Sequence, residues 1–230
     1  MSQIGQIAWQ SIRAVIIDLD GTLLDTVADL AAAANAVRLD AGMPALEQQR
    51  IGQFVGQGAD ILMHRTMTDS ADGRLEPEPF ARARAAFDHH YAIENGRHAQ
   101  LFPGVRSGLD RMIAHGLKLA CVTNKPQMFT DPLLARHELT ACFEIVLGGD
   151  ALPRKKPDPL PLLHIAQTFD LTPGQCLMIG DSINDARAAR SAGMPVLIVP
   201  YGYNEGHDVA TLDCDGIVNS LDHAARLLGA

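Results

Sequence analysis

The chain of 230 residues lacks the features that mark nucleic-acid-binding, membrane-spanning and secreted proteins. It has no run of Lys or Arg and a formal net charge of −8, so neither nucleic acid nor a membrane surface is expected as a partner. No stretch approaches the roughly 18 consecutive apolar residues of a spanning helix. The N-terminal stretch MSQIGQIAWQSIRA has no basic segment followed by a long apolar one, so we expect no secretory signal.

Cysteine is also scarce, and its positions are widely separated. The four cysteines, which form no C-x-x-C pair, are Cys121, Cys142, Cys176 and Cys214. We therefore expect free thiols in a reducing compartment and neither a disulfide framework nor a metal cluster. Together these absences predict a soluble cytoplasmic protein, with a monomer and a homodimer left open.

What the sequence does contain is an alternation of short apolar runs and helical patterns. The runs at 12–18, 117–123, 144–147, 176–180 and 196–199 predict strands, and the patterns at 105–115, 129–137, 161–169 and 185–192 predict helices. Such alternation is typical of βαβ units. The sequence therefore predicts an α/β fold, a Rossmann-like doubly wound parallel sheet with helices on both faces.

One long segment interrupts the alternation. Helical patterns such as TVADLAAAANAVRLDAG follow one another between residues 25 and 100 without a convincing strand, and the segment far exceeds an ordinary crossover. Pro and Gly in LFPG mark the return to the alternating pattern. We therefore predict an all-helical cap domain over residues 25–100, inserted into a core formed by residues 1–24 and 101–230.

Polar residues follow the predicted strands. In an open parallel sheet, ligands bind in the crevice beyond the carboxyl ends of the strands. The residues placed there are Asp18 and Asp20 after the first strand, Thr123 and Asn124 after the second, Lys155 and Lys156 after the third, and Asp181 and Asp185 after the fourth. Carboxylates, lysines and neutral donors are thus expected in one crevice.

The carboxylates need a positive partner. Two of them about 5 Å apart repel by roughly 3 kcal/mol at an effective dielectric constant of about 20. Either some are protonated or a divalent cation lies among them. Carboxylate oxygens without His or Cys suit Mg²⁺, for which Asp18 and Asp181 are the natural side-chain ligands.

The remaining groups suit a phosphoryl group. Thr123 and Asn124 offer neutral donors, and Lys156 offers a fixed positive charge. A carboxylate can attack phosphorus, and a second one can act as general acid and base. The residues by themselves predict a phosphatase and leave open which of Asp18 and Asp20 attacks.

Four ordered segments give this reading a family. DLDGTLLDT, VTNKP, KKPDPLP and GDSINDARAARSAG resemble the four motifs of haloacid dehalogenase-like hydrolases, and the resemblance extends from Arg13 to about Leu228. Within that superfamily, FVGQGADILMHR, LGGDALPRKKPDPLPLL and YGYNEG are similar to the phosphoglycolate phosphatase family.

The resemblance implies a role for each motif residue. Asp18 would be the nucleophile, Asp20 the general acid and base that also offers its backbone carbonyl to Mg²⁺, Thr123 and Asn124 the phosphoryl-binding pair, Lys156 the neutralising cation, Asp181 the last metal ligand and Asp185 its orienting partner. Asp20 also favours a phosphatase, since dehalogenating relatives lack an Asp at that position.

The cap would select the substrate. GQFVGQG shares only its glycines with a phosphate loop, so it is either a bend between helices or a loop that closes over the site. In the second reading Gly56, Gly58 and Arg65 face the organic end of the substrate, and Arg65 is the candidate for binding a carboxylate. We expect Asp25 to be structural and Lys155 to be a solvated neighbour. YGYN either lines the rim of the crevice or packs a turn.

The predicted function is a Mg²⁺-dependent phosphomonoesterase. It would hydrolyse 2-phosphoglycolate, a small phosphate ester, to glycolate and phosphate through an aspartyl-phosphate. A sugar-phosphate phosphatase acting on a substrate such as N-acetylmuramate 6-phosphate, and a phosphomutase, are the alternatives. A signalling receiver would be roughly half as long, without a cap or Asp20, and a non-catalytic binding protein would not need both Asp18 and Asp20.

Overall fold

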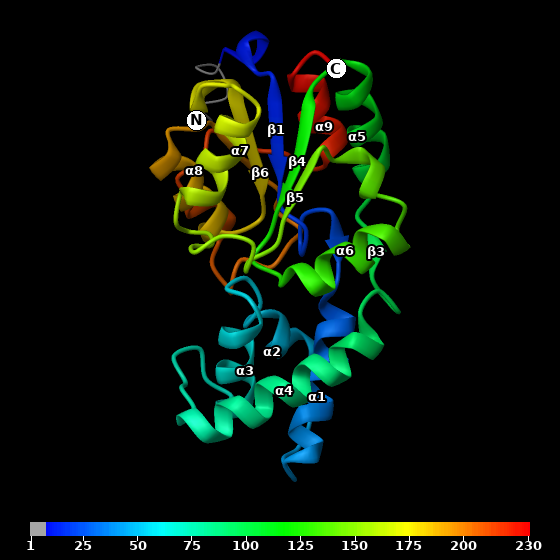
Figure 1. Ribbon diagram of the computed structural model, residues 1–230, viewed down its shortest axis with the longest axis vertical. Helices are drawn as coiled ribbons and strands as arrows, with labels where there is room; N and C mark the ends of the chain where they lie inside the picture. The colour runs from blue at the N-terminus through cyan, green and yellow to red at the C-terminus, as the bar shows by residue number, and fades with distance from the viewer. Residues whose placement is uncertain (1–7) are drawn as a thin grey trace.

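The computed structural model describes residues 8–230 (Figure 1). Residues 1–7 lie outside the described residues. They begin both the predicted core segment 1–24 and the N-terminal stretch in which no secretory signal is expected. A six-stranded sheet has the order β5-β4-β1-β6-β7-β8, and every neighbouring pair is parallel. Its strands are β1 (Ala14–Ile17), β4 (Lys118–Val122), β5 (Ile145–Leu147), β6 (Cys176–Gly180), β7 (Val196–Ile198) and β8 (Gly216–Ile217).

This sheet confirms the predicted doubly wound α/β fold. The chain runs outward from β1 in one direction through β4 and β5, and in the other through β6, β7 and β8. The order therefore reverses between β1 and β6, where doubly wound proteins bind their ligands. The strand β8 was not predicted, because a strand of two residues is too short to produce a hydrophobic pattern.

Helices cover both faces of the sheet, so the central strands are apolar throughout. All four residues of β1 are buried. Val15 and Ile17 join a core with α5 (Val105–Ala114), α6 (Gln127–Arg136) and α9 (Leu221–Leu227) on one face. Ala14 and Ile16 join a second core with α7 (Leu160–Thr168) and α8 (Ile183–Ala192) on the other. Burial on both faces explains why the strands read as continuous apolar runs.

The interrupting segment is helical, as predicted. It consists of α1 (Val27–Asp40), α2 (Gln48–Gly52), α3 (Ala59–Thr68) and α4 (Pro77–Glu94), which together we call the cap (Figure 1). The cap helices share their own apolar core, to which α6 contributes Phe129. The division into two domains remains a prediction.

The two connections between the cap and the sheet run side by side. A short antiparallel pair joins β2 (Leu24–Asp25) and β3 (Gln100–Leu101), and the predicted boundaries fall inside it. Asp29 of α1 is fully buried and accepts hydrogen bonds from the backbone N–H groups of Gly96 (2.8 Å), His98 (2.7 Å) and Ala99 (3.2 Å). The beginning of the cap is therefore tied to its end.

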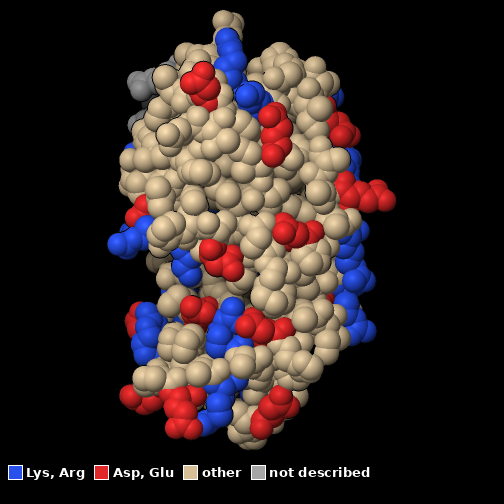
Figure 2. Space-filling model, viewed as in Figure 1, with Lys and Arg blue, Asp and Glu red and all other residues tan. Residues whose placement is uncertain are grey.

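Short 3-10 helices complete the described chain, at Trp9–Ser11, Thr140–Cys142, Pro173–Gln175 and Val209–Thr211. None of the helices within residues 8–230 combines the length and the apolar character needed to cross a membrane. Acidic and basic side chains are interspersed over the face of the molecule in Figure 2. All four cysteines are free thiols, as predicted.

Candidate active site

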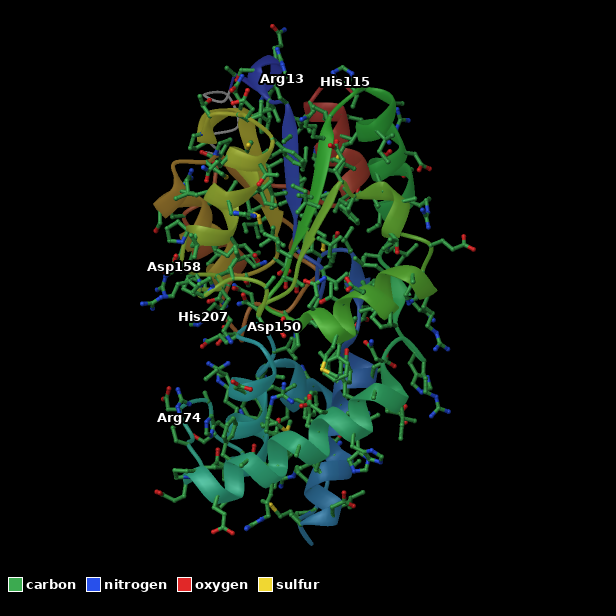
Figure 3. The ribbon with its side chains drawn as sticks, viewed as in Figure 1. Arg13, Arg74, His115, Asp150, Asp158 and His207 are labelled. Atoms are coloured by element: carbon green, nitrogen blue, oxygen red, sulfur yellow. The ribbon has the colours of Figure 1, made fainter. Side chains whose placement is uncertain are left out.

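The carboxyl ends of the strands point toward the cap. Arg13 precedes β1 and His115 precedes β4, and both lie at the end of the molecule remote from the cap (Figure 3). Asp150 and Asp158, which follow β5, lie where the sheet meets the cap (Figure 3). The polar residues that follow the strands are therefore brought to the boundary between sheet and cap.

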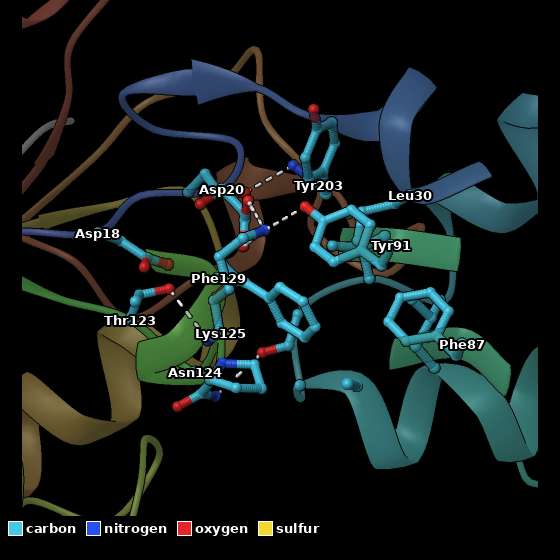
Figure 4. A pocket seen from close by; sticks show the side chains of 18 residues that line it. Asp18, Asp20, Leu30, Phe87, Tyr91, Thr123, Asn124, Lys125, Phe129 and Tyr203 are labelled. Carbon is cyan, nitrogen blue, oxygen red and sulfur yellow. Dashed lines mark hydrogen bonds and ion pairs between the residues drawn. The ribbon is translucent and has the colours of Figure 1, made fainter. Parts of the chain in front are cut away.

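A pocket opens at this boundary (Figure 4). From the sheet side it is lined by Asp18, Asp20, Thr123, Asn124, Lys125, Pro126, Phe129, Asp181, Ser182 and Tyr203, and from the cap by Leu30, Val55, Gly56, Gly58, Ala59, Leu62, Phe87 and Tyr91. Its sheet side is polar, whereas its cap side is mostly apolar. Lys156 and Asp185 lie behind this lining.

Lys156 is the positive centre of the carboxylate cluster. Its ammonium lies 2.9 Å from Asp18 Oδ1 and 2.7 Å from Asp185 Oδ1, and it donates to the Val122 carbonyl at 2.7 Å. The side chain is 1% exposed. Burial opposes the charged form, but Asp18 and Asp185 outweigh it and raise the pKa of Lys156 above its usual value.

Asp185 joins this cluster to the start of α8. Ser182 is the N-cap of the helix and Asp185 its third residue, which together form a capping box. Asp185 Oδ2 accepts from the Ser182 hydroxyl (2.8 Å) and from the backbone N–H groups of Ser182 (3.1 Å) and Asp181 (3.2 Å). These bonds fix the loop that carries Asp181.

The Asp181 carboxylate is held from two further loops. Its Oδ1 accepts from the Thr22 hydroxyl at 2.9 Å, and its Oδ2 accepts from the Tyr203 backbone N–H at 2.6 Å. The chain passes so close at Gly21 and Gly202 that a Cβ atom at either position would overlap Asp181. Asp181 therefore lies in a cradle that only glycine permits.

Asp18, Asp181 and Asp185 offer oxygen atoms within 4.8 Å of one another. Burial, opposed by Lys156 and reinforced by Asp185, raises the pKa of Asp18 to about 7. Burial and the two neighbouring carboxylates also raise the pKa of Asp181 well above its usual value. Asp18 Oδ2 accepts no hydrogen bond from residues 8–230. Crowded, incompletely paired carboxylate oxygens are the donor set of a hard divalent cation, so these residues fit a metal ion.

Three neutral donors lie beside Asp18. Asn124 donates both of its side-chain hydrogens, to the carbonyls of Gly56 (3.0 Å) and Lys156 (2.9 Å), so its side chain joins the cap to the sheet. Within the described chain, the backbone N–H groups of Asp20 and Asn124 have no acceptor. These two N–H groups and the Thr123 hydroxyl are the donors that a phosphoryl group could use. Asn124 would therefore contribute through its backbone and not through its side chain.

Asp20 has partners in both layers. Its Oδ1 accepts from the Thr26 hydroxyl at 2.7 Å. The same oxygen accepts from Lys125 Nζ at 2.9 Å (Figure 4). Lys125 also donates to the Tyr91 hydroxyl of α4 at 2.5 Å. Lys125 is the lysine of VTNKP, and the sequence gives it no role of its own, because its partner Tyr91 is 34 residues away in the cap.

The predicted cap residues divide into two groups. Gly56 and Gly58 line the pocket and have φ values of 133° and 86°, a region that favours glycine. A Cβ atom at Gly58 would lie 2.9 Å from the Asn124 carbonyl, so the second glycine also permits close approach. The two glycines therefore allow residues 53–58, the loop between α2 and α3 that we call the cap loop, to lie against the sheet.

The expectation that Arg65 faces the substrate is wrong. Arg65 is buried and does not line the pocket. Its guanidinium forms an ion pair with Glu205 at 2.7 Å and donates to the carbonyls of Ala71 (2.9 Å) and Phe54 (3.3 Å). These partners occupy the guanidinium, so it is not available for a substrate carboxylate.

Arg65 belongs instead to a group of contacts between sheet and cap. Glu205 also accepts from the side-chain amides of Gln57 (2.9 Å) and Asn184 (3.1 Å). Lys155, expected to be solvated, donates to the Gln57 carbonyl at 2.9 Å. We call Arg65, Gln57, Glu205 and Lys155 the latch, because they attach the cap loop to the sheet.

YGYN serves both of the roles considered for it. Tyr203 lines the pocket. Its hydroxyl accepts from the backbone N–H groups of Thr26 (2.8 Å) and Val27 (3.0 Å) and donates to Asp25. Tyr201 packs on Phe102 with ring centroids 4.3 Å apart. Asp25 accepts from the Tyr203 hydroxyl and from the Val27 backbone N–H at the start of α1 (3.3 Å), in keeping with a structural role.

Comparison with known proteins places this arrangement in a family. The family described as haloacid dehalogenase-like hydrolase matches residues 15–199. The phosphoglycolate phosphatases of Nitrosospira multiformis and Thiobacillus denitrificans are 48% and 46% identical, each over 94% of this chain and 96% of its own. The crystal structure of a predicted phosphoglycolate phosphatase from Haemophilus somnus has a TM-score of 0.89 at 32% identity and covers 94% of this chain and 98% of its own. The chain therefore belongs to the haloacid dehalogenase-like hydrolase family.

Proposed function

We propose that the protein is a Mg²⁺-dependent phosphatase that hydrolyses 2-phosphoglycolate in the cytoplasm. The observation that carries the proposal is that Asp18 lies beside Lys156 and near the backbone N–H groups of Asp20 and Asn124. Within residues 8–230, Asp18 Oδ2 and these two N–H groups have no hydrogen-bond partner. The names of the similar proteins support the substrate. The four free thiols, of which Cys121 and Cys176 are buried, fit a reducing compartment.

In the first step Asp18 Oδ2 attacks phosphorus and the bond from phosphorus to the ester oxygen breaks. Asp20 gives its proton to that oxygen, and glycolate leaves. Lys156 offsets the charge of Asp18, while the Thr123 hydroxyl and the backbone N–H groups of Asp20 and Asn124 bind the phosphoryl oxygens. The product of this step is a phosphoryl group bonded to Asp18.

In the second step Asp20, now ionised, takes a proton from water, and the water oxygen attacks phosphorus. The bond between Asp18 and phosphorus breaks, and phosphate leaves. Asp18, Asp181 and the Asp20 carbonyl would hold Mg²⁺, which when bound neutralises the phosphoryl oxygens. Asp185 would act through its bonds to the Asp181 loop and to Lys156.

Phosphate release from a panel of esters tests the proposal. The panel holds 2-phosphoglycolate, N-acetylmuramate 6-phosphate and hexose phosphates, each with Mg²⁺, with EDTA and with Asp18→Asn. We expect release to be fastest from 2-phosphoglycolate, absent with EDTA and lowered at least about a thousandfold in Asp18→Asn. Preference for a sugar phosphate would refute the substrate and keep the mechanism. No release by the folded protein would favour a mutase.

A further inference from the structure

The organic end of a substrate would meet an apolar wall with one cation in it. Leu30, Val55, Leu62 and Phe87 form much of the cap side of the pocket, and Phe129 of α6 packs with the apolar core of the cap. Among the pocket-lining residues of the described chain, Lys125 is the only Lys or Arg. An anionic group on the substrate therefore has one positively charged side chain to meet, since Arg65 is occupied by the latch.

The Tyr91 hydroxyl retains an unpaired hydrogen, and Lys125 has one long hydrogen bond. A lysine ammonium has three donors, and within residues 8–230 Lys125 Nζ contacts both carboxylate oxygens of Asp20 (2.9 and 3.2 Å) and the Tyr91 hydroxyl (2.5 Å). The contact at 3.2 Å is the longest of the three, and a substrate carboxylate would take its place. The Tyr91 hydroxyl accepts from Lys125, and its own hydrogen has no acceptor in the same part of the chain. Tyr91 is 1% exposed, so water reaches this hydroxyl poorly. Buried donors of this kind bind an anionic oxygen strongly.

Burial keeps the Tyr91 hydroxyl protonated. Desolvation, reinforced by the charges of Asp20 and Asp29, raises the pKa of Tyr91 well above its usual value. The ring is held between Phe87, with centroids 5.2 Å apart, and Phe129, with centroids 5.0 Å apart. The hydroxyl therefore has a fixed position.

The position of these donors matches a short substrate. Asp20, the proposed proton donor to the ester oxygen, lies 2.9 Å from Lys125 Nζ. In 2-phosphoglycolate the carboxylate carbon is two bonds from that ester oxygen. A substrate carboxylate at this distance from Asp20 would lie beside Lys125, which contacts Asp20, and beside Tyr91, which contacts Lys125 (Figure 4).

We propose that Lys125 Nζ and the Tyr91 hydroxyl form the binding site for the substrate carboxylate, and that they select small phosphate esters whose carboxylate lies two bonds from the ester oxygen. This assignment rests on the proposed phosphatase function and replaces Arg65 in the role expected from the sequence. Because Lys125 is in the sheet layer and Tyr91 in the cap, the site is complete only when the two are together.

The test compares two substrates that differ in the carboxylate. The values of kcat/KM are measured for 2-phosphoglycolate and for ethyl phosphate, and their ratio is compared among wild type, Lys125→Met and Tyr91→Phe. Lys118→Met is the matched control, since Lys118 is exposed at the far end of β4. Damage to Asp20 lowers both rates alike and cancels in the ratio, whereas loss of a carboxylate contact does not.

We expect Lys125→Met to lower the ratio by roughly 10- to 100-fold, Tyr91→Phe by roughly 2- to 10-fold, and Lys118→Met not at all. In wild type, lengthening the substrate by one methylene, to 3-phosphooxypropionate, should also lower kcat/KM. An unchanged ratio in Lys125→Met would overturn the carboxylate site and leave Lys125 as a residue that positions Asp20.

Two further outcomes remain distinct. If Lys125→Met does not fold, Tyr91→Phe decides by the same ratio, because it removes only a hydroxyl from a ring held by its neighbours. If wild type itself hydrolyses ethyl phosphate as well as 2-phosphoglycolate, the proposed substrate fails first, and the carboxylate site fails with it.

Discussion

Glu205→Gln removes the charge at the centre of the latch and tests whether the latch holds the cap over the pocket. The Glu205 carboxylate lies 2.7 Å from Arg65, and both side chains are 9% exposed. Gln keeps the shape of Glu and can still accept one hydrogen bond. The substitution therefore removes the ion pair with little change in packing.

The magnitude follows from burial. Removing one partner of a buried ion pair destabilises a protein by about 3–5 kcal/mol, because the remaining charge is left without compensation. Since Gln retains one acceptor, we expect about 2 kcal/mol here. Because the pair joins the cap to the sheet, its loss destabilises the closed arrangement of the two relative to an open one. A loss of about 2 kcal/mol corresponds to roughly a 30-fold decrease in the ratio of closed to open molecules. The KM for the substrate should then rise by up to about 30-fold.

Steady-state kinetics and urea unfolding measure the effect together. Glu78→Gln is the matched control, because it makes the same change in a pair with Arg82 whose Glu is 84% exposed, where at most about 1 kcal/mol is expected. In the double variant with Arg65→Met, the loss should be smaller than the sum of the single losses. The reasoning is refuted if Glu205→Gln and Glu78→Gln are indistinguishable in both assays.

Two more predictions concern the carboxylates that we propose to bind Mg²⁺. Gly202→Ala should abolish Mg²⁺-dependent activity, because the added Cβ displaces Asp181, whereas Gly174→Ala meets nothing within 4 Å and should be silent in the same assay. Without metal, the free energy of unfolding should fall as pH rises from 3.8 to about 7, because folded Asp18 keeps a proton that the unfolded chain releases, and Asp181 acts in the same direction. Thermal denaturation should then show Mg²⁺ raising the Tm more at pH 8 than at pH 5.5; an equal rise would contradict the role of these carboxylates.

The centre of the fold was predictable because its strands are buried on both faces. The runs that predicted β1 and β6 consist of side chains that all enter a core, so burial alone produces the pattern. The strands β2, β3 and β8 were missed because each has two residues, and the first two form only by pairing with each other. Pairing over a long sequence separation leaves no local pattern.

The same distinction divides the site. Four of the predicted residues directly follow strands: Asp18, Asp20, Thr123 and Asp181. Parallel topology brings the carboxyl ends of the strands to one edge of the sheet, independently of the loop conformations. The position of Arg65 depends on Glu205, 140 residues later in the chain, and no helical pattern specifies such a partner. The expectation for Arg65 failed for this reason, although Gly56 and Gly58, in the loop before α3, do line the pocket.

Three consecutive residues after β4 make the chemistry depend on the cap. Thr123 presents its hydroxyl beside Asp18, Asn124 uses its side chain to hold the Gly56 carbonyl of the cap loop, and Lys125 contacts both Asp20 and Tyr91 of α4. These three residues are consecutive and are joined by planar peptide bonds. The contacts of Asn124 and Lys125 with the cap therefore also restrict the position of Thr123. Movement of the cap away from the sheet would therefore remove the contacts that position Asn124 and Lys125 at the same time.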